Sequence, residues 1–192
     1  MPDNIDRRVA RTQRAMRAAL VGLLRRKAYA DITVQDILDE ADIGRSTFYS
    51  HCSGKDQLVR LSFRLLRAEL AAAASEERDD APACLLPFAL PVIRHLADHR
   101  DLYGAFAGSQ ASDLLLGELR QLVLELARGD LKHLTIAADV PPDVALQFVA
   151  GAFTALLAWW LDGRGRLAPE ALDAMFQQLI RDGLAGQRTV AS

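Results

Sequence analysis

Hydrophobic residues recur every three or four positions along most of the chain, and runs that alternate hydrophobic and polar residues are almost missing. A spacing of three and four places apolar side chains on one side of an α-helix, whereas a half-buried strand needs a period of two. The pattern therefore predicts an all-α protein. The expected helices cover about residues 6–27, 34–42, 45–51, 53–77, 83–99, 102–107, 112–134, 142–161 and 169–184.

Capping residues mark where the helices after the first one begin. Thr33 and Asp36 have the spacing of a capping box, in which each side chain bonds the other's backbone N–H, and Ser53 and Asp56 repeat it. Gly44 can cap the short helix between them at little cost. Two short helices joined by a tight turn and braced by a longer first helix are typical of a helix-turn-helix, whose second helix enters the major groove of DNA.

The second short helix has one apolar side and one side rich in hydroxyl groups. Phe48 and Cys52 fall toward the core, whereas Ser46 and Ser50 lie opposite. Small side chains on the outer side allow such a helix to sit close to DNA. The alternative is an ordinary solvated surface, which the helical pattern alone does not exclude.

Longer side chains around this helix suit contacts with DNA. Arg45 can bond guanine O6 and N7 together, a contact worth about 1–3 kcal/mol of discrimination. Tyr49, His51, Thr33 and Lys55 are placed to reach phosphate oxygens, and such contacts position a protein without reading sequence. The candidate DNA-binding residues are Thr33, Arg45, Ser46, Thr47, Tyr49, Ser50, His51 and Lys55.

Charge is distributed unevenly along the chain. The net charge of the 192 residues is −2, but residues 1–60 hold 11 Lys and Arg against 8 Asp and Glu, and residues 61–192 hold 12 against 17. A basic beginning suits a polyanion, and an acidic remainder should avoid one. We expect a DNA-binding domain at 1–60 and a larger helical domain at 61–192, with the charged "RDDAP" segment marking a bend in the chain.

Composition narrows the remaining classes of protein. Hydrophobic residues make up 51% and charged residues 25%, which is typical of a folded protein. Cys52 and Cys84 lack the spacing of a disulfide framework or a metal site. We expect no window long and apolar enough to cross a membrane, no signal peptide and a cytoplasmic location. No glycine-rich phosphate loop, nucleophile elbow or metal-ligand cluster indicates an enzyme, so we expect no cofactor and no metal.

The segment "ITVQDILDEADIGRSTFYSHCSGKDQL" resembles the DNA-binding segment of the tetracycline-repressor (TetR) family, in which the pattern T-x-x-x-[IL]-A-x-x-A-G-V-S-x-x-T-x-Y-x-H-F-x-x-K-[ED]-x-L recurs. The resemblance covers about residues 7–60, and the matching positions are Thr33, Ile37, Ala41, Ile43, Thr47, Tyr49, His51, Lys55, Asp56 and Leu58. It implies phosphate contacts by Tyr49, His51 and Lys55, base contacts by Arg45, and a pocket for a small-molecule inducer.

The chain departs from the family pattern at three positions. Asp42 replaces the turn glycine, which is tolerable because aspartate visits the left-handed region more readily than most residues. Gly44 replaces the serine cap. Cys52 replaces a phenylalanine. Its smaller side chain fills less of the space behind Phe48, so we expect looser local packing.

The larger half should supply a dimer interface and a pocket. One short reading helix makes too few contacts for specific binding, so two chains are needed, and the last two helices could form a four-helix bundle with those of a second copy. The expected interface residues are Phe148, Gly151, Ala152, Ala155, Trp159, Met175, Phe176 and Leu179. The expected pocket residues are His99, Tyr103, Phe106, Gln110 and Trp159. Burial within one subunit remains an equal alternative for each interface residue.

The leading hypothesis is a homodimeric repressor that a small-molecule inducer releases from a near-palindromic double-stranded DNA operator. A ligand-independent regulator or an activator with the same helix-turn-helix is the alternative. The third class, an enzyme, lacks any supporting motif.

Overall fold

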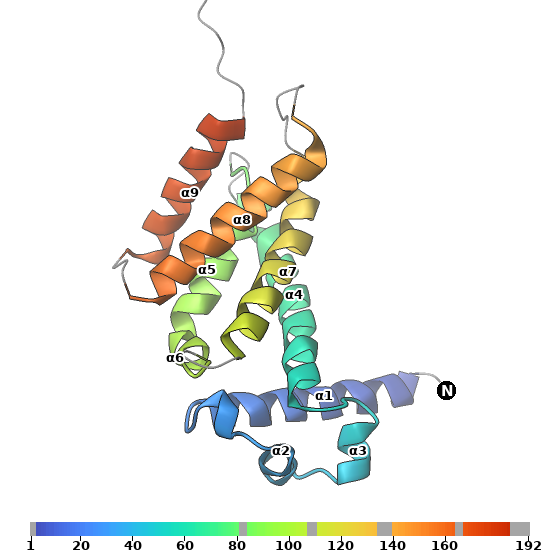
Figure 1. Cartoon of the computed structure of the whole chain (residues 1–192). Helices are drawn as coiled ribbons and strands as arrows, with labels where there is room; N and C mark the ends of the chain where they lie inside the picture. The colour runs from blue at the N-terminus through green and yellow to red at the C-terminus, as the bar shows by residue number, and fades with distance from the viewer. Residues whose placement is uncertain (1–2, 81–83, 107–110, 134–139, 164–166, 185–192) are drawn as a thin grey trace, which may run out of the picture. The chain divides into compact units, whose positions relative to one another are not determined.

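The computed structural model describes residues 3–80, 84–106, 111–133, 140–163 and 167–184. Within these residues the secondary structure is α-helical apart from one short 3-10 turn, and no strand is present (Figure 1). The predicted all-α fold is confirmed. The chain divides into two compact units: Met1–Leu65 with Asp101–Leu115, and Leu66–Arg100 with Leu116–Ser192.

The first unit holds the three predicted N-terminal helices and a later segment of the chain. Its elements are α1 (Asp3–Leu24), the 3-10 turn η1 (Tyr29–Asp31), α2 (Val34–Ala41), α3 (Arg45–Tyr49), the beginning of α4 (Lys55–Asp80), most of α6 (Arg100–Gly104) and the first residues of α7 (Ala111–Leu131). α1 packs against α2. The core includes Met16, Ile37, Phe48 and Leu58, each with no exposed surface, and each such side chain contributes about 1.5–3 kcal/mol by leaving water.

The second unit contains the rest of α4 and α7 together with α5 (Ala89–Asp98), α8 (Pro142–Leu161) and α9 (Pro169–Leu184). α9 packs against both α5 and α8. Three aromatic rings join these helices at the core: Phe153 meets Phe88 edge-on at 5.2 Å between ring centroids and lies 4.6 Å from Phe176. Contacts of this kind add to the stabilisation from burial alone.

The helix expected over residues 83–99 begins later than predicted. Residues 84–88 are not helical, and Pro87 disfavours helical backbone at the residue before it. The side-chain amide of Gln177 accepts from the backbone N–H of Leu86 at 3.1 Å and donates to its carbonyl at 3.0 Å. The Asp130 carboxylate accepts from the N–H of Phe88 at 3.0 Å. These buried bonds satisfy the segment's backbone groups without a helix.

The expectation about membrane-spanning length was wrong. Residues 144–161 contain no charged side chain, and α8 is long and apolar enough to cross a membrane by length and composition. One side of α8 is buried in the second unit, through Ala145, Leu146, Val149, Ala150, Phe153, Leu157 and Trp160. The core helix of a globular unit passes the same test of length and composition, so α8 alone is weak evidence for a membrane span.

Candidate nucleic-acid interface

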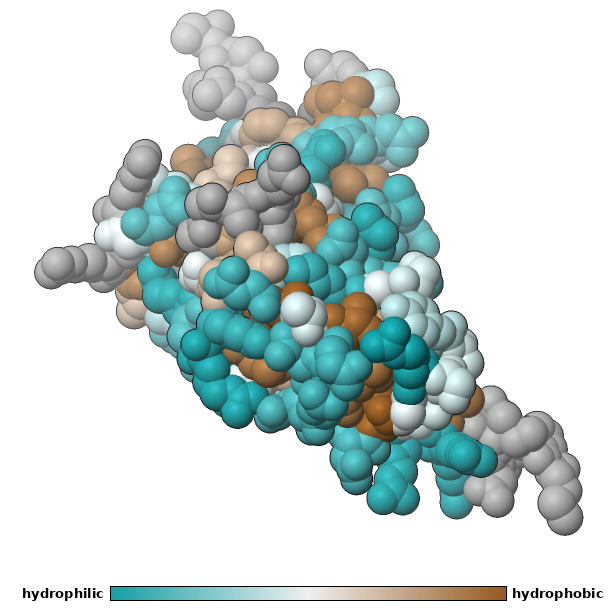
Figure 2. Space-filling model, turned by 60° about the horizontal axis from the view of Figure 1, so that its bottom comes forward, coloured by the Kyte–Doolittle hydropathy of each residue, from teal (hydrophilic) through white to brown (hydrophobic). Residues whose placement is uncertain are grey.

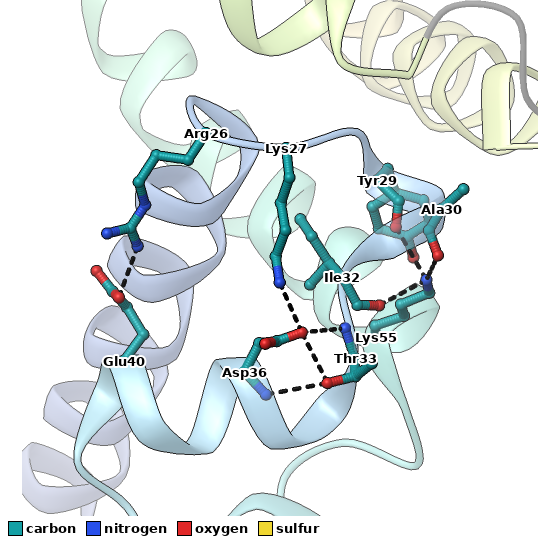
Figure 3. A network of polar contacts seen from close by, with 9 residues as sticks. All are labelled: Arg26, Lys27, Tyr29, Ala30, Ile32, Thr33, Asp36, Glu40 and Lys55. Carbon is teal, nitrogen blue, oxygen red and sulfur yellow. Dashed lines mark hydrogen bonds and ion pairs between the residues drawn. The ribbon is translucent and has the colours of Figure 1, made fainter.

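The predicted capping box at the start of α2 is present. The Thr33 hydroxyl accepts from the backbone N–H of Asp36 at 3.1 Å, and the Asp36 carboxylate accepts from the N–H of Thr33 at 2.7 Å (Figure 3). Lys27 forms an ion pair with the same carboxylate at 2.9 Å. The hydrogen bond from Lys27, together with those from Thr33, holds the pKa of Asp36 well below its usual range. The entry to α2 is therefore fixed by charge and by hydrogen bonds.

The turn between α2 and α3 has the predicted left-handed residue. Asp42 ends α2 with φ 51° and ψ 50°, a conformation that aspartate tolerates better than most side chains. Gly44 precedes α3 and offers no side-chain cap. α3 ends at Tyr49, two residues earlier than predicted, and Ser50 and His51 follow in a turn. The left-handed residue Asp42 before α3 and the turn at Ser50 and His51 after it bound this short helix.

α3 presents its polar side to solvent. Phe48 is fully buried, whereas Arg45, Ser46, Tyr49 and Ser50 are exposed. Thr47 and His51 are half-buried. Figure 2, which brings the α2 and α3 end of Figure 1 forward, shows mostly hydrophilic residues there with smaller hydrophobic areas between them. The arrangement is a short exposed helix that can approach a nucleic acid closely.

Lys55 has a role that the sequence did not indicate. Its ammonium donates to the carbonyl oxygens of Tyr29, Ala30 and Ile32 at 2.9, 3.2 and 2.8 Å (Figure 3). It also lies 4.6 Å from the centroid of the Tyr29 ring. All three ammonium protons therefore have acceptors within the chain. A phosphate contact by Lys55 would require one of these bonds to break.

The second predicted capping box is wrong. The carboxylate of Asp56 accepts from the Tyr29 hydroxyl at 2.5 Å, while the backbone N–H of Ser53 donates to the side-chain oxygen of Gln57. Burial, reinforced by the bond to Asp56, raises the pKa of the Tyr29 phenol well above its usual value. Because Tyr29 is buried next to the start of α4, it takes the acceptor that a capping box would have used.

Tyr29 also contacts the later segment of the first unit. Its ring stacks on Phe106 with 4.7 Å between centroids, and its backbone N–H donates to the carbonyl of Ala105 at 3.1 Å. Phe106 is only 4% exposed. Its ring covers Tyr29 in the core of the first unit, and its place in a ligand pocket stays a prediction.

The other predicted pocket residues are not gathered within one unit. Tyr103 belongs to the first unit and His99 to the second, where the His99 ring stacks on His95 with 4.4 Å between centroids. Trp159 is 40% exposed. Gln110 lies outside the described residues. In the part of the chain that the structure describes, no group of three or more His, Cys, Asp or Glu could hold a metal ion.

An exposed apolar face runs along α8 and α9. Phe148, Met175 and Leu179 are 52%, 53% and 66% exposed, although side chains of this kind are normally buried. Ala152 and Ala155 are also exposed, and Gly151 is half-buried. Val144, at 57%, belongs to this set and was missed because it stands at the polar start of the helix. We call these residues, with Trp159, the α8–α9 face.

Phe176 is not part of the α8–α9 face. Only 2% of its surface is exposed, and its ring packs against Phe153 inside the second unit. The prediction of Phe176 as a dimer contact is therefore wrong. Neighbouring apolar residues of an amphipathic helix divide between its two sides, and sequence spacing alone did not separate Met175 from Phe176.

Comparisons with known proteins agree with this geometry. Residues 17–61 match the family model described as bacterial regulatory proteins, tetR family. An HTH-type transcriptional regulator of Bacillus subtilis, YxbF, is 40% identical over 67 residues, which are 34% of this chain and 18% of that protein. The DNA replication and repair protein RecF of Geobacter sp. strain M21 is 30% identical over 154 residues, or 70% of this chain and 36% of that protein. The chain thus spans well under half of either curated relative.

The similarity to solved structures extends over most of the chain. A TetR transcriptional regulator from Streptococcus agalactiae is 26% identical with a TM-score of 0.63, covering 94% of this chain and 99% of the other. α2, the left-handed residue Asp42 and the exposed α3 together have the arrangement of a helix-turn-helix. The family model over residues 17–61 and the similarity along the whole fold support a regulator of the TetR family.

Proposed function

We propose that the chain is a cytoplasmic, homodimeric repressor that a small-molecule ligand releases from a near-palindromic operator. The observation that carries the proposal is the exposure of Arg45, Ser46, Tyr49 and Ser50 on one side of α3. In this proposal Arg45 reads a base while Tyr49, His51 and Thr33 contact phosphates. Phosphate contacts fix the position of the helix, and the base contact supplies discrimination.

The α8–α9 face supports the proposed dimer. Its apolar side chains are exposed on two adjacent helices, and a second copy of the same face would cover them in a four-helix bundle. Small residues at Gly151, Ala152 and Ala155 allow close approach of the two copies of α8. Two chains would place two α3 helices about 34–36 Å apart, one turn of DNA.

The proposed response to a ligand has support within the first unit. Asp101–Leu115 belongs to the same compact unit as the helix-turn-helix, and Phe106 stacks on Tyr29 there. The carbonyl of Tyr29 is in turn bonded to Lys55 at the start of α4. A shift of Phe106 would therefore disturb Tyr29 and the bond between its carbonyl and Lys55. A ligand acts in this way only if it prefers the shape that does not bind DNA.

Selection of duplexes from a random library tests the proposal. We expect the enriched sequence to contain two related half-sites in two-fold symmetry, about 10–10.5 base pairs from centre to centre or a multiple of that distance. A single half-site without symmetry would contradict the dimer. Native mass spectrometry of the purified chain, followed by addition of any co-purified molecule to the protein–DNA complex, tests release. An unchanged complex with every bound molecule would contradict ligand control.

The alternative of an activator is tested with the same operator. A reporter placed behind the selected sequence should be expressed less when the chain is present. Higher expression in its presence would favour activation.

A further inference from the structure

One hydrogen bond joins the side chains of α2 and α3 on the solvent side of the helix-turn-helix. Arg45 Nη2 donates to Gln35 Oε1 at 3.0 Å. Both residues are exposed, so the bond is not forced by packing in the core. Arg45 is the first residue of α3, and Gln35 is the second residue of α2. The guanidinium is thus tied to the preceding helix before any DNA is present.

Gln35 is itself held by a second bond. Its Nε2 donates to Asp39 Oδ1 at 2.8 Å, and residues four apart on a helix lie next to each other. Because an amide has its acceptor and its donors on different atoms, the bond to Asp39 turns the oxygen of Gln35 toward Arg45. The three side chains form an ordered series from Asp39 through Gln35 to Arg45.

The strength of the bond between Gln35 and Arg45 decides whether Arg45 can still bind DNA. A guanidinium has five N–H donors in a fixed plane, and the bond to Gln35 uses one of them. A neutral amide oxygen holds a cation less tightly than a carboxylate would. Arg45 can therefore keep the bond to Gln35 and still present donors to guanine, without first leaving an ion pair.

We propose that Gln35 and Asp39 are positioning residues that set the direction of the Arg45 guanidinium and so the base preference of α3. The inference rests on the proposed role of Arg45 in reading a base. Without Gln35, the long Arg45 side chain samples more rotamers, and ordering it at the DNA costs conformational entropy. Gln35 then affects specificity through Arg45 rather than by its own contact.

The test measures the affinity of the full chain for the selected duplex and for duplexes with each base pair changed in turn. Arg45→Ala should reduce discrimination at one base-pair position per half-site, by about 5- to 150-fold. Gln35→Ala should reduce discrimination at the same position, by about 3- to 10-fold, because the contact remains but is less ordered. In an Arg45→Ala background, Gln35→Ala should change nothing further.

Two variants of Asp39 separate hydrogen bonding from charge. Asp39→Asn keeps an oxygen that can accept from Gln35, whereas Asp39→Ala removes it, and both remove the same negative charge. Discrimination should survive in Asp39→Asn and fall in Asp39→Ala, while general DNA affinity changes equally in both. Gln121→Ala is the matched control, since Gln121 on α7 makes the same kind of bond to Glu125 at 3.0 Å. It should bind as the unmodified chain does.

Different results overturn different statements. If Arg45→Ala relaxes base preference and Gln35→Ala does not, the positioning role is wrong while the proposed function stands. If Gln35→Ala changes preference at another base pair and still does so in the Arg45→Ala background, Gln35 reads a base directly and the inference is wrong. If Arg45→Ala leaves every preference unchanged, the base-reading role of Arg45 in the proposed function fails as well.

Discussion

At the scale of single residues, the ammonium group of Lys55 has all its hydrogen-bond acceptors within the chain. Its sequence position suits a phosphate contact, but in the structure it bonds the backbone carbonyls of Tyr29, Ala30 and Ile32, in and just after η1, and so ties them to the start of α4. A hydrogen bond to a charged group is worth more than one between neutral groups. The charge of Lys55 therefore stabilises the helix-turn-helix as a folded unit.

Replacing Lys55 by methionine keeps most of its length and removes the ammonium group. We expect the free energy of unfolding to fall by about 1–3 kcal/mol, because three carbonyls lose a charged donor. Denaturant unfolding measures this change. Tyr49→Ala is the comparison: its side chain is 50% exposed, so DNA affinity should fall with little change in unfolding. Equal stability of the Lys55→Met variant and the unmodified chain would contradict the structural role.

The lowered pKa of Asp36 predicts how the free energy of unfolding depends on pH. Its pKa is lowered in the folded chain by Lys27 and Thr33 from an ordinary value of 3.8. A group with a lowered folded pKa stabilises the fold above its unfolded pKa, and that contribution is lost as the pH falls below it. The free energy of unfolding should therefore decrease from about pH 5 downward more steeply in the unmodified chain than in Asp36→Asn. Parallel pH profiles would contradict the contribution of Asp36.

At the scale of elements, α8 and α9 divide their apolar residues between a core side and an exposed side. Leu179 is 66% exposed while Ile180 beside it is 2% exposed. The exposed side, continued by Phe148 and Met175, is the feature that supports association of two chains.

Leu179→Glu should prevent this association. A charge at this position of the α8–α9 face would be buried without a partner in the dimer, which is costly, but would remain in water in a single chain. Sedimentation equilibrium should show the unmodified chain as a dimer and the variant as a monomer, with unchanged helical content. Leu116→Glu, at another exposed leucine on α7, should stay dimeric. If both variants remain dimers, the interface lies elsewhere.

The sequence predicts the elements better than their contacts. Periodicity and capping residues placed α2, α8 and α9 closely, because these signals are local. The start of α5 was missed, since its position depends on Gln177 and Asp130 from distant helices. The roles of Lys55 and Phe106 were missed for the same reason: both depend on Tyr29, whose neighbours are set by the tertiary fold. The spacing of four between Gln35 and Asp39 is enough to predict that their side chains meet on α2. The bond from Arg45 to Gln35 is visible only in the structure.

At the scale of the whole molecule, the boundary between functional parts does not follow the order of the chain. Residues 1–60 were expected to form the DNA-binding domain, and the first compact unit also includes Asp101–Leu115. This later segment contacts Tyr29 of η1, shortly before α2, through Phe106 and Ala105. Part of the later sequence is thus built into the unit that carries α3, which gives the proposed ligand response a physical route within one unit.

The proposed function requires that the exposed side of α3 enters the major groove, and a negative charge introduced on that side tests this requirement. Ser46→Glu places a carboxylate at an exposed position of α3, while Ser75→Glu makes the same change on the exposed surface of α4. Affinity for the selected duplex should fall by about 100-fold or more in Ser46→Glu, because a carboxylate facing DNA costs several kcal/mol. It should stay within about twofold in Ser75→Glu, where the charge is screened. Equal affinities of the two variants would contradict the account.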